Sequence, residues 1–337
     1  ALPSVGLGAG MTTAQQKTNA DGDPELDTNK PIIIDSQIFS FAVAGGGAGS
    51  VALNGSLALN WIRNDIDAHI SGGATATATN GTVTLLADDK ASMSVLAGSG
   101  GGAGSVAVGV GIAYNYIGGD PDNPGSSNVN NIQAYIDNAT INASALNITA
   151  RSDADINALV VAVSGSGSFA GNGAISLNWI RKHVDVHISG GSTVTITNDV
   201  ALLASDTSDI RSIAGQISGS GGAAIGGAVA YNEISNTIEA YISGTSSVTS
   251  SAGDVKVRTL SSANIFTIAA GISGSGGVGV SGSAAVNLIE NDIRAYISAS
   301  TVTAQDNVLV FAESTDHVQS YVGAVSVAGS VGVGGSV

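Results

Sequence analysis

Hydrophobic and polar residues alternate with a period of two along most of the chain. In Val255–Arg258 and Ile293–Ile297, every second residue is apolar and most residues between are polar or charged. Such alternation is typical of β-strands with one buried face. Valine, isoleucine and threonine are abundant, whereas the helix formers leucine, glutamate, lysine and glutamine are scarce. The pattern predicts an all-β protein without significant helix.

The strand segments recur as one long internal repeat. The sequence Leu59–Arg63 returns unchanged at Leu177–Arg181, and an asparagine two residues before an isoleucine marks the same slot in other repeats. A Gly-rich stretch, which we interpret as a linker, precedes each of these anchor asparagines. The longest interval contains residues 118–125, whose glycines and prolines are typical of a surface loop. The anchors are spaced by 55, 63, 54 and 55 residues, which gives a period of about 55: Asn60, Asn115, Asn178, Asn232 and Asn287.

A second slot has the same period and holds an aromatic or imidazole ring followed by isoleucine. Its residues are His69, Tyr135, His187, Tyr241 and Tyr296. Strands with a strict repeat stack in a solenoid, where equivalent residues form ladders parallel to the axis. Stacked asparagine side chains can hydrogen-bond from one repeat to the next. We therefore predict a repetitive β-solenoid, parallel β-helix-like, in which both ladders are structural.

The repeat divides the chain into two parts. Residues 1–30 are polar and lack the pattern, which predicts an N-terminal cap or linker. Residues 31–337 form an array of about five and a half repeats, and we expect it to continue beyond Val337 because the next anchor asparagine is due just after that residue. Each repeat is either two or three short coils or one wide coil flattened into two layers. The many small residues favour the flattened coil, because small side chains let two sheets approach closely.

Charge and cysteine content narrow the function classes. The chain has 26 acidic and 11 basic residues, a net charge of −15. This argues against partners such as nucleic acid or anionic lipid, which need Lys and Arg. There is no cysteine, which excludes disulfides and thiolate metal sites. The longest apolar run, residues 158–163, is too short to cross a bilayer, so we expect no membrane insertion.

The sequence offers little that resembles an active site. Gly-x-Ser-x-Gly triplets lie in Gly/Ser-rich stretches where they arise by chance, and no HExxH motif or phosphate-binding loop is present. Glycoside cleavage needs paired carboxylates in one groove. We interpret the acids here as scattered, solvated turn residues: Asp88, Asp89, Asp153, Asp155, Asp206 and Asp209. We therefore predict that the protein is not an enzyme and has no cofactor other than, at most, calcium.

One acidic segment is a candidate calcium site. Its carboxylates alternate in a stretch that also contains a glycine and a proline: Asp21, Asp23, Glu25 and Asp27. Oxygen-rich loops of this kind bind calcium. The spacing matches neither an EF-hand nor the nonapeptide calcium repeat, and a plain acidic linker is the alternative interpretation.

Short Thr-x-Thr segments form a further slot, at residues 75–79, 193–197 and 301–303. Flat threonine arrays are displayed by solenoid ice-binding proteins. The alternative is the ordinary preference of threonine for exposed strands.

Three features of the repeat together carry a family resemblance. They are the Ser-Gly-Ser-Gly-Gly run at 218–222 and 273–277, the Asn-x-Ile anchor, and the Ala-Tyr-Ile-Ser strand at 240–243 and 295–298. In this combination, residues 31–337 resemble the repeats of very large secreted bacterial adhesins, the filamentous-haemagglutinin and leukotoxin-type filamentous adhesins. The resemblance implies export from a Gram-negative bacterium and display as a surface fibre.

The sequence therefore predicts a non-enzymatic structural or adhesive segment of a bacterial extracellular or cell-surface fibre. The expected partners are a ligand on a host cell, a neighbouring cell or a matrix, and further copies or repeats of the chain itself. Two alternatives stay open. One is a self-assembling extracellular filament subunit that joins through exposed end coils. The other is a carbohydrate-binding or carbohydrate-cleaving β-helix.

Overall fold

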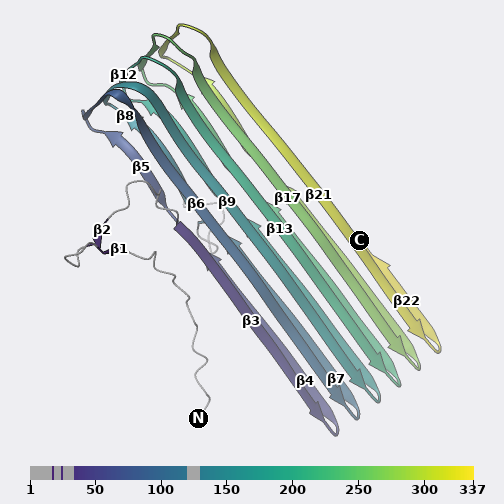
Figure 1. The fold of residues 1–337 in the computed structure, drawn as a ribbon. Helices are drawn as coiled ribbons and strands as arrows, with labels where there is room; N and C mark the ends of the chain where they lie inside the picture. The colour runs from purple at the N-terminus through teal and green to yellow at the C-terminus, as the bar shows by residue number, and fades with distance from the viewer. Residues whose placement is uncertain (1–16, 19–23, 26–33, 120–129) are drawn as a thin grey trace.

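The repeat of about 55 residues is a single wide coil of β-strands in the computed structural model (Figure 1). The structure describes residues 17–18, 24–25, 34–119 and 130–337. A complete coil contains a long strand, a tight reversal, a return strand, a short strand and a second short segment. This second segment is a separate strand in the later coils and is continuous with the next long strand in the first two. All pairings between coils are parallel, and equivalent residues of successive coils lie side by side. The predicted β-solenoid is confirmed, the flattened coil is the correct alternative, and no helix occurs among the described residues.

Three parallel sheets run along the solenoid axis. The long sheet contains the long strands β3 (Ile34–Ala48), β6 (Thr75–Ala103), β9 (Thr140–Ser166), β13 (Val200–Ser220), β17 (Val255–Ser275) and β21 (Val308–Ala328), together with the short strands β12 (Thr193–Ile196), β16 (Ser247–Ser250) and β20 (Thr301–Ala304). The return sheet contains β4 (Val51–Ile62), β7 (Val106–Ile117), β10 (Phe169–Ile180), β14 (Ala223–Ile234), β18 (Val278–Ile289) and β22 (Val331–Ser336). The head sheet contains β5 (Ile66–Ser71), β8 (Asn130–Asp137), β11 (Lys182–Ser189), β15 (Thr237–Ile242) and β19 (Asp292–Ile297).

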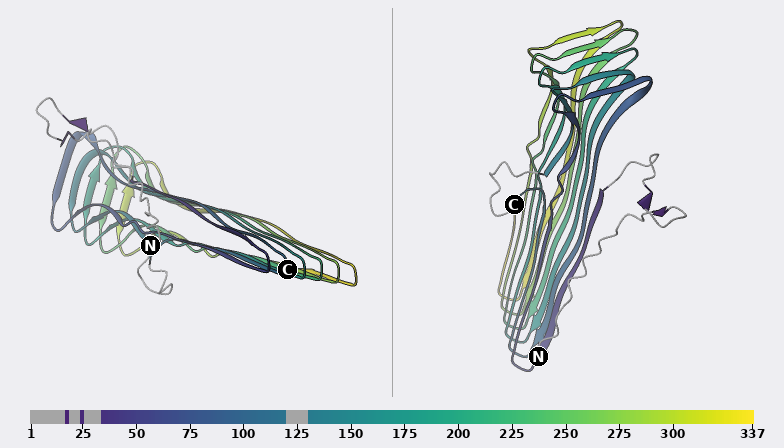
Figure 2. Two further views of the ribbon diagram at one scale, coloured as in Figure 1. Left: turned by 90° about the horizontal axis from the view of Figure 1, so that it is seen from below. Right: turned by 90° about the vertical axis from the view of Figure 1, so that its left-hand side faces the viewer.

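The coil is wide at one end and thin at the other (Figure 2). We call the wide end the head. There, the head sheet and the short strands enclose a core of Ile, Val and Leu side chains such as Ile136, Ile148 and Val248.

We call the thin part the blade. There, the long sheet packs directly on the return sheet. The blade interior holds isoleucine and alanine near the head, such as Ile156 and Ala158, and buried serines such as Ser164 and Ser218 farther out. The decreasing size of the inward side chains therefore sets the taper of the coil.

The reversal at the thin end of the blade, the tip, requires glycine. Gly221 and Gly222 join β13 to β14, and equivalent glycines occupy the same turn in other coils. A Cβ atom on Gly221 would overlap the carbonyl oxygen of Gly167 in the preceding coil, and a Cβ on Gly276 would overlap that of Gly221. The Gly-rich stretches are thus not linkers, as the sequence suggested, but strand ends and tip turns.

The array begins at β3, close to the boundary expected from the sequence at residue 31. Before it, β1 (Lys17–Thr18) and β2 (Pro24–Glu25) form a two-stranded antiparallel ribbon. Residues 120–129, which include most of the loop predicted at 118–125, lie outside the described residues. Within the described ranges, no helix is long and apolar enough to span a membrane.

Candidate functional site

The outer face of the head sheet carries a continuous stack of rings. In each strand the ring occupies an outward position between inward apolar residues, as His187 does between Val186 and Ile188. Because the strands pair in register, the rings of successive coils lie above one another. Neighbouring ring centroids are 4.8–4.9 Å apart, with interplanar angles of 3–9°. The structure thus brings together all residues of the predicted ring slot: His69, Tyr135, His187, Tyr241 and Tyr296.

Stacking decides what this ring row can bind. The faces of Tyr135, His187 and Tyr241 are covered by their neighbours, so these rings present only their edges. A sugar that stacks on an aromatic side chain needs an open ring face, and the inner rings do not offer one. What the row does offer is a line of hydroxyl groups and imidazole nitrogens that donate and accept hydrogen bonds at a spacing of about 4.8 Å.

A polar row lies beside the rings, two residues earlier in each strand. Its members are Asp67, Gln133, Asp185, Glu239 and Arg294. The Oδ2 atom of Asp185 is 2.8 Å from Nδ1 of His187, and Oδ1 of Asp67 is 2.9 Å from Nδ1 of His69. Burial and the Asp67 carboxylate raise the pKa of the Tyr135 phenol. The phenol therefore remains a neutral hydrogen-bonding group, and the face as a whole suits a polar, extended partner.

The anchor asparagines form a hydrogen-bonded ladder inside the blade, next to the head. Each side chain except that of Asn287 donates from Nδ2 to Oδ1 of the asparagine in the next coil. The four bonds, which link Asn60, Asn115, Asn178, Asn232 and Asn287 in that order, measure 2.8, 2.7, 2.7 and 2.8 Å. Asn115, Asn178 and Asn232 are fully buried. The ladder therefore satisfies polar groups that burial would otherwise leave unpaired, which is a structural role.

A buried charged cluster lies where the blade meets the head, and sequence reasoning missed it. Lys182 at the start of β11 forms an ion pair with Asp89 of β6, and both side chains are fully buried. Asp206 of β13 accepts hydrogen bonds from Ser208 at 2.9 Å and from Asn236 at 2.8 Å. Burial raises the pKa of the Asp206 carboxyl, against the influence of the nearby Lys182 ammonium.

The interpretation of the acids as turn residues is wrong. All of them lie within strands: Asp88 and Asp89 in β6, Asp153 and Asp155 in β9, Asp206 and Asp209 in β13. Asp88, Asp89 and Asp206 are buried. The alternation itself contained the signal, because Asp89 has the same inward parity as Leu85, Ala87 and Ala91.

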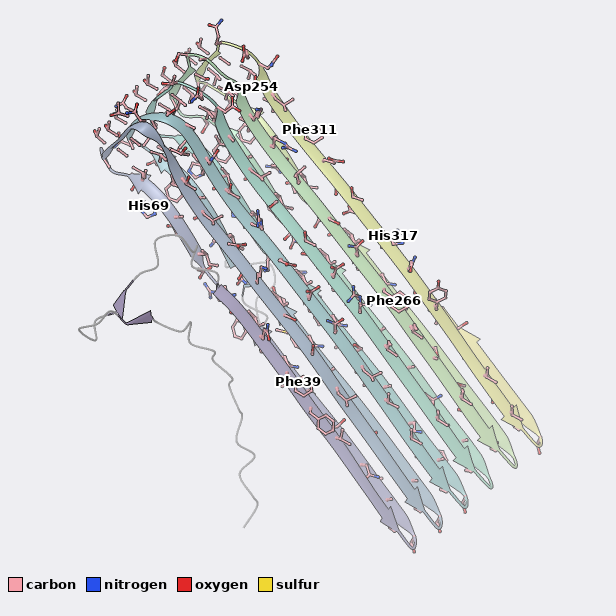
Figure 3. The ribbon with its side chains drawn as sticks, in the orientation of Figure 1. Phe39, His69, Asp254, Phe266, Phe311 and His317 are labelled. Carbon is pink, nitrogen blue, oxygen red and sulfur yellow. The ribbon has the colours of Figure 1, made fainter. Side chains whose placement is uncertain are left out.

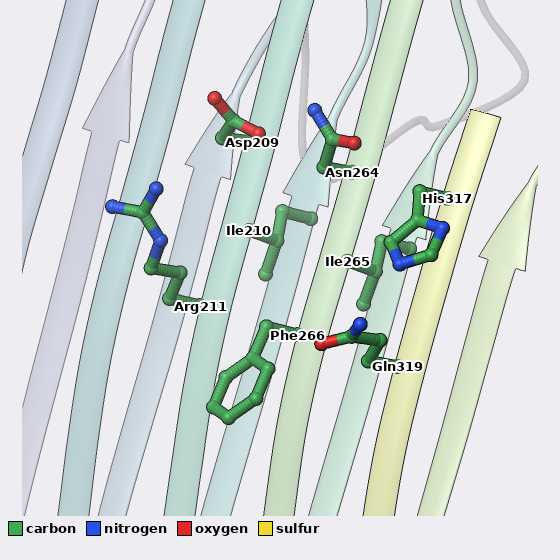
Figure 4. Close-up of a pocket in the computed structure, with 8 residues that line it drawn as sticks. All are labelled: Asp209, Ile210, Arg211, Asn264, Ile265, Phe266, His317 and Gln319. Carbon is green, nitrogen blue, oxygen red and sulfur yellow. The ribbon is translucent and has the colours of Figure 1, made fainter. Parts of the chain in front are cut away.

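The outer face of the long sheet has a hollow of about 540 Å³ across β13, β17 and β21 (Figure 4). Asp209 and Arg211 line it on β13, Phe266 on β17, and His317 and Gln319 on β21. Figure 3 shows Phe266 and His317 on the open side of the long sheet. The hollow therefore combines charged, polar and aromatic groups on an exposed surface.

The remaining expectations concern metal and threonine. Asp21, Asp23 and Asp27 lie outside the described residues, and of Glu25 only the backbone is described, in β2. The calcium site therefore stays a prediction. Among the described residues, no group of three or more His, Asp or Glu is placed to hold a metal ion. The threonine slot forms outward rows on β12, β16 and β20, where Thr195 pairs with Thr249 and Thr249 with Thr303.

No protein-family model, curated protein or solved structure matches this chain.

Proposed function

We propose that the chain is a non-enzymatic structural and adhesive segment of a bacterial extracellular or cell-surface fibre. The supporting observation is the register, which repeats the same outward positions from coil to coil in all three sheets, with one shift between Ala78 and Thr82 where β6 pairs with β9. Each outward position becomes a row along the axis, as the rings and the polar residues beside them do on the head. Many equivalent weak contacts in one row add up to strong attachment to a repetitive surface.

The dimensions of the coil favour surface over reach. One coil of about 55 residues lengthens the solenoid by only about 4.8 Å, the spacing of paired strands. By contrast, the 21 residues of β13 alone extend over about 70 Å across the axis. A fold that uses so many residues for so little axial length is a wide ribbon. We propose that its role is to display large flat faces.

Bead adhesion under flow tests this function. Beads coated with the chain should be retained on cultured epithelial cells or on extracellular matrix more strongly than albumin-coated beads. A matched bead carrying Tyr135→Ala and Tyr241→Ala should lose retention if the ring row is the adhesive strip. Retention no better than albumin on every surface, or release of reducing sugar from polysaccharide by the chain, would contradict the proposal.

A filament subunit is a second candidate, supported by an edge of the array. Among the described strands, β3, β4 and β5 pair only toward the second coil, so the first coil has an unpaired edge. Edge strands with free backbone groups are templates for pairing with another chain. Electron microscopy of the chain at increasing concentration should show lengthening filaments if end coils join, and particles of constant length if they do not.

A further inference from the structure

The outer side of the return sheet is an apolar face. Its outward residues, which we call the blade face, form rows parallel to the solenoid axis, because successive return strands pair in register. Two aliphatic rows flank one row made mostly of glycine. The first aliphatic row contains Leu53, Val108, Ile225, Val280 and Val333 and is interrupted by Gly171 in β10, and the second contains Leu57, Ile112, Ile175, Val229 and Ala284. The row between them contains Gly55, Val110, Gly173, Gly227, Gly282 and Gly335.

The aliphatic side chains of the blade face are partly or largely exposed to solvent. Leu53 is 72% exposed, Ile225 46% and Val229 41%. The interior of the blade contains large apolar side chains such as Met93 and Ile156 near the head, but mainly alanine, glycine and serine toward the tip. Toward the tip, the larger apolar side chains thus point outward, which reverses the usual order of a two-sheet protein. A contiguous exposed apolar patch of this kind marks an interaction site.

Charge is scarce in the blade and concentrated elsewhere. Five of the stretches that form the blade contain no Asp, Glu, Lys or Arg: residues 36–62, 91–119, 156–180, 265–289 and 318–337. The equivalent stretch of the fourth coil, residues 210–234, contains two charged residues near the head, Arg211 and Glu233. The charged residues described by the structure therefore lie on the head or where the blade meets it. Two copies can bring their blade faces together without facing like charges. An antiparallel arrangement also separates the acidic heads by about 40 Å, the length of a 12-residue return strand, which is several times the screening length of about 8 Å at physiological salt.

In the glycine row, the three glycines of the last three coils are not required by steric contacts within the chain. Gly227, Gly282 and Gly335 do not have positive φ angles, and a Cβ atom on any of them would meet nothing within 4 Å. The tip glycine Gly221 is different, because its Cβ would overlap backbone of the preceding coil. Glycine inside a strand weakens a sheet and often marks the close approach of another backbone. Here it leaves a groove between two ridges, the profile that one sheet needs to receive a side-chain row of another.

The area of the face matches a stable protein pair. Five return strands of 12 residues are about 40 Å long, and β22, with 6 residues, is about half that length. At a spacing of about 4.8 Å, the six strands give a face of roughly 900 Å². A standard interface covers about 800 Å² on each partner. We propose that the blade face binds the blade face of a second copy of this chain, antiparallel, with an aliphatic row of each copy over the glycine row of the other. This surface goes beyond the fibre role and does not depend on it.

Filling the groove tests the pairing. Sedimentation velocity of the chain over a concentration series should show a dimer. Gly227→Leu places a side chain into the groove, where the chain itself leaves room, and should weaken dimerisation by about tenfold or more, equivalent to about 1.4 kcal/mol. The matched control is Gly215→Leu on the opposite face of the same coil, where a Cβ also meets nothing. This variant should dimerise like the parent. Both variants should keep the parent's circular dichroism spectrum, and its urea midpoint at concentrations where the parent is monomeric.

Cross-linking then locates the contact. The chain has no cysteine, so Ile175→Cys on the blade face reports that surface alone and should give a covalent dimer with a short bismaleimide. Val161→Cys, on the outer side of the long sheet in the same coil, should remain a monomer. A parent chain that stays monomeric, equal dimerisation of the Gly227→Leu and Gly215→Leu variants, or cross-linking only at residue 161 would overturn the proposal. So would a monomeric chain that floats with neutral phosphatidylcholine vesicles, since the face would then serve a lipid surface.

Discussion

Replacing Asn178 by alanine should destabilise the protein strongly, because Asn178 is the middle member of the buried asparagine ladder. It accepts from Asn115 at 2.7 Å and donates to Asn232 at 2.7 Å. Asn178→Ala leaves Nδ2 of Asn115 and Oδ1 of Asn232 without these partners. Each buried unsatisfied group costs about 1–3 kcal/mol, so the free energy of unfolding should fall by about 2–6 kcal/mol. The end member Asn60 provides the matched control, since Asn60→Ala removes only the donor to Oδ1 of Asn115 and should cost about half as much.

Urea unfolding measures this difference. Trp179 lies next to Asn178 and between the rings of Tyr114 and Tyr231, at 4.9 and 5.3 Å, so its fluorescence reports local packing. Circular dichroism follows the whole array, and coincident transitions are needed because long repeat arrays can unfold in parts. If Asn178→Ala and Asn60→Ala lowered stability equally, or if Asn178→Ala cost less than about 1 kcal/mol, the ladder would not be the source of the stability assigned to it.

Three further changes test the interior. Lys182→Met should lower the free energy of unfolding by about 3–5 kcal/mol, because the Asp89 carboxylate then stays buried without its ion-pair partner. Adding Asp89→Leu should recover most of that loss. The denaturant midpoints of the single and double variants measure the loss and the recovery. Gly221→Ala at the tip should lower the midpoint clearly and Gly227→Ala hardly at all, since only the first new methyl group meets backbone. Burial makes folded Asp206 hold its proton to higher pH than the unfolded chain does, so stability should fall as pH rises above about 4. Asp206→Asn should flatten that part of the pH profile of melting temperature, and an unchanged profile would contradict the buried carboxyl.

Much of the fold could be predicted because the repeats can be aligned with one another. Each coil presents the same alternation again, so the inward Asn178 and the outward His187 are recognised by their equivalents in other coils. Parallel stacking follows from that repetition. The number of coils per repeat could not be predicted in the same way. Alternation is local and identical in short and wide coils, and the choice depends on how the return strand packs on the long strand.

The charged interior shows where sequence reasoning stopped. The parity of Asp89 indicates an inward side chain, but its partner Lys182 is 93 residues away, and only the closed coil brings the two together. The sequence also contains part of the signal for the blade face, since residues 265–289 contain no charge. Whether this lack of charge indicates a binding surface depends on the fold, because an uncharged strand is ordinary when both of its faces are buried and unusual when one face is exposed to solvent.

A distance between two spin labels tests the single wide coil most directly, and every surface described above depends on that coil. Labels would be placed on cysteines replacing Thr77 and Thr303, two exposed positions in the threonine rows. These residues belong to one ladder and are four coils apart, through residues 142, 195 and 249. One coil per repeat predicts a backbone separation of about 19 Å, which pulsed electron–electron double resonance can measure. Two or three short coils per repeat would give about 40–60 Å, and a distance in that range would contradict the fold and the faces built on it.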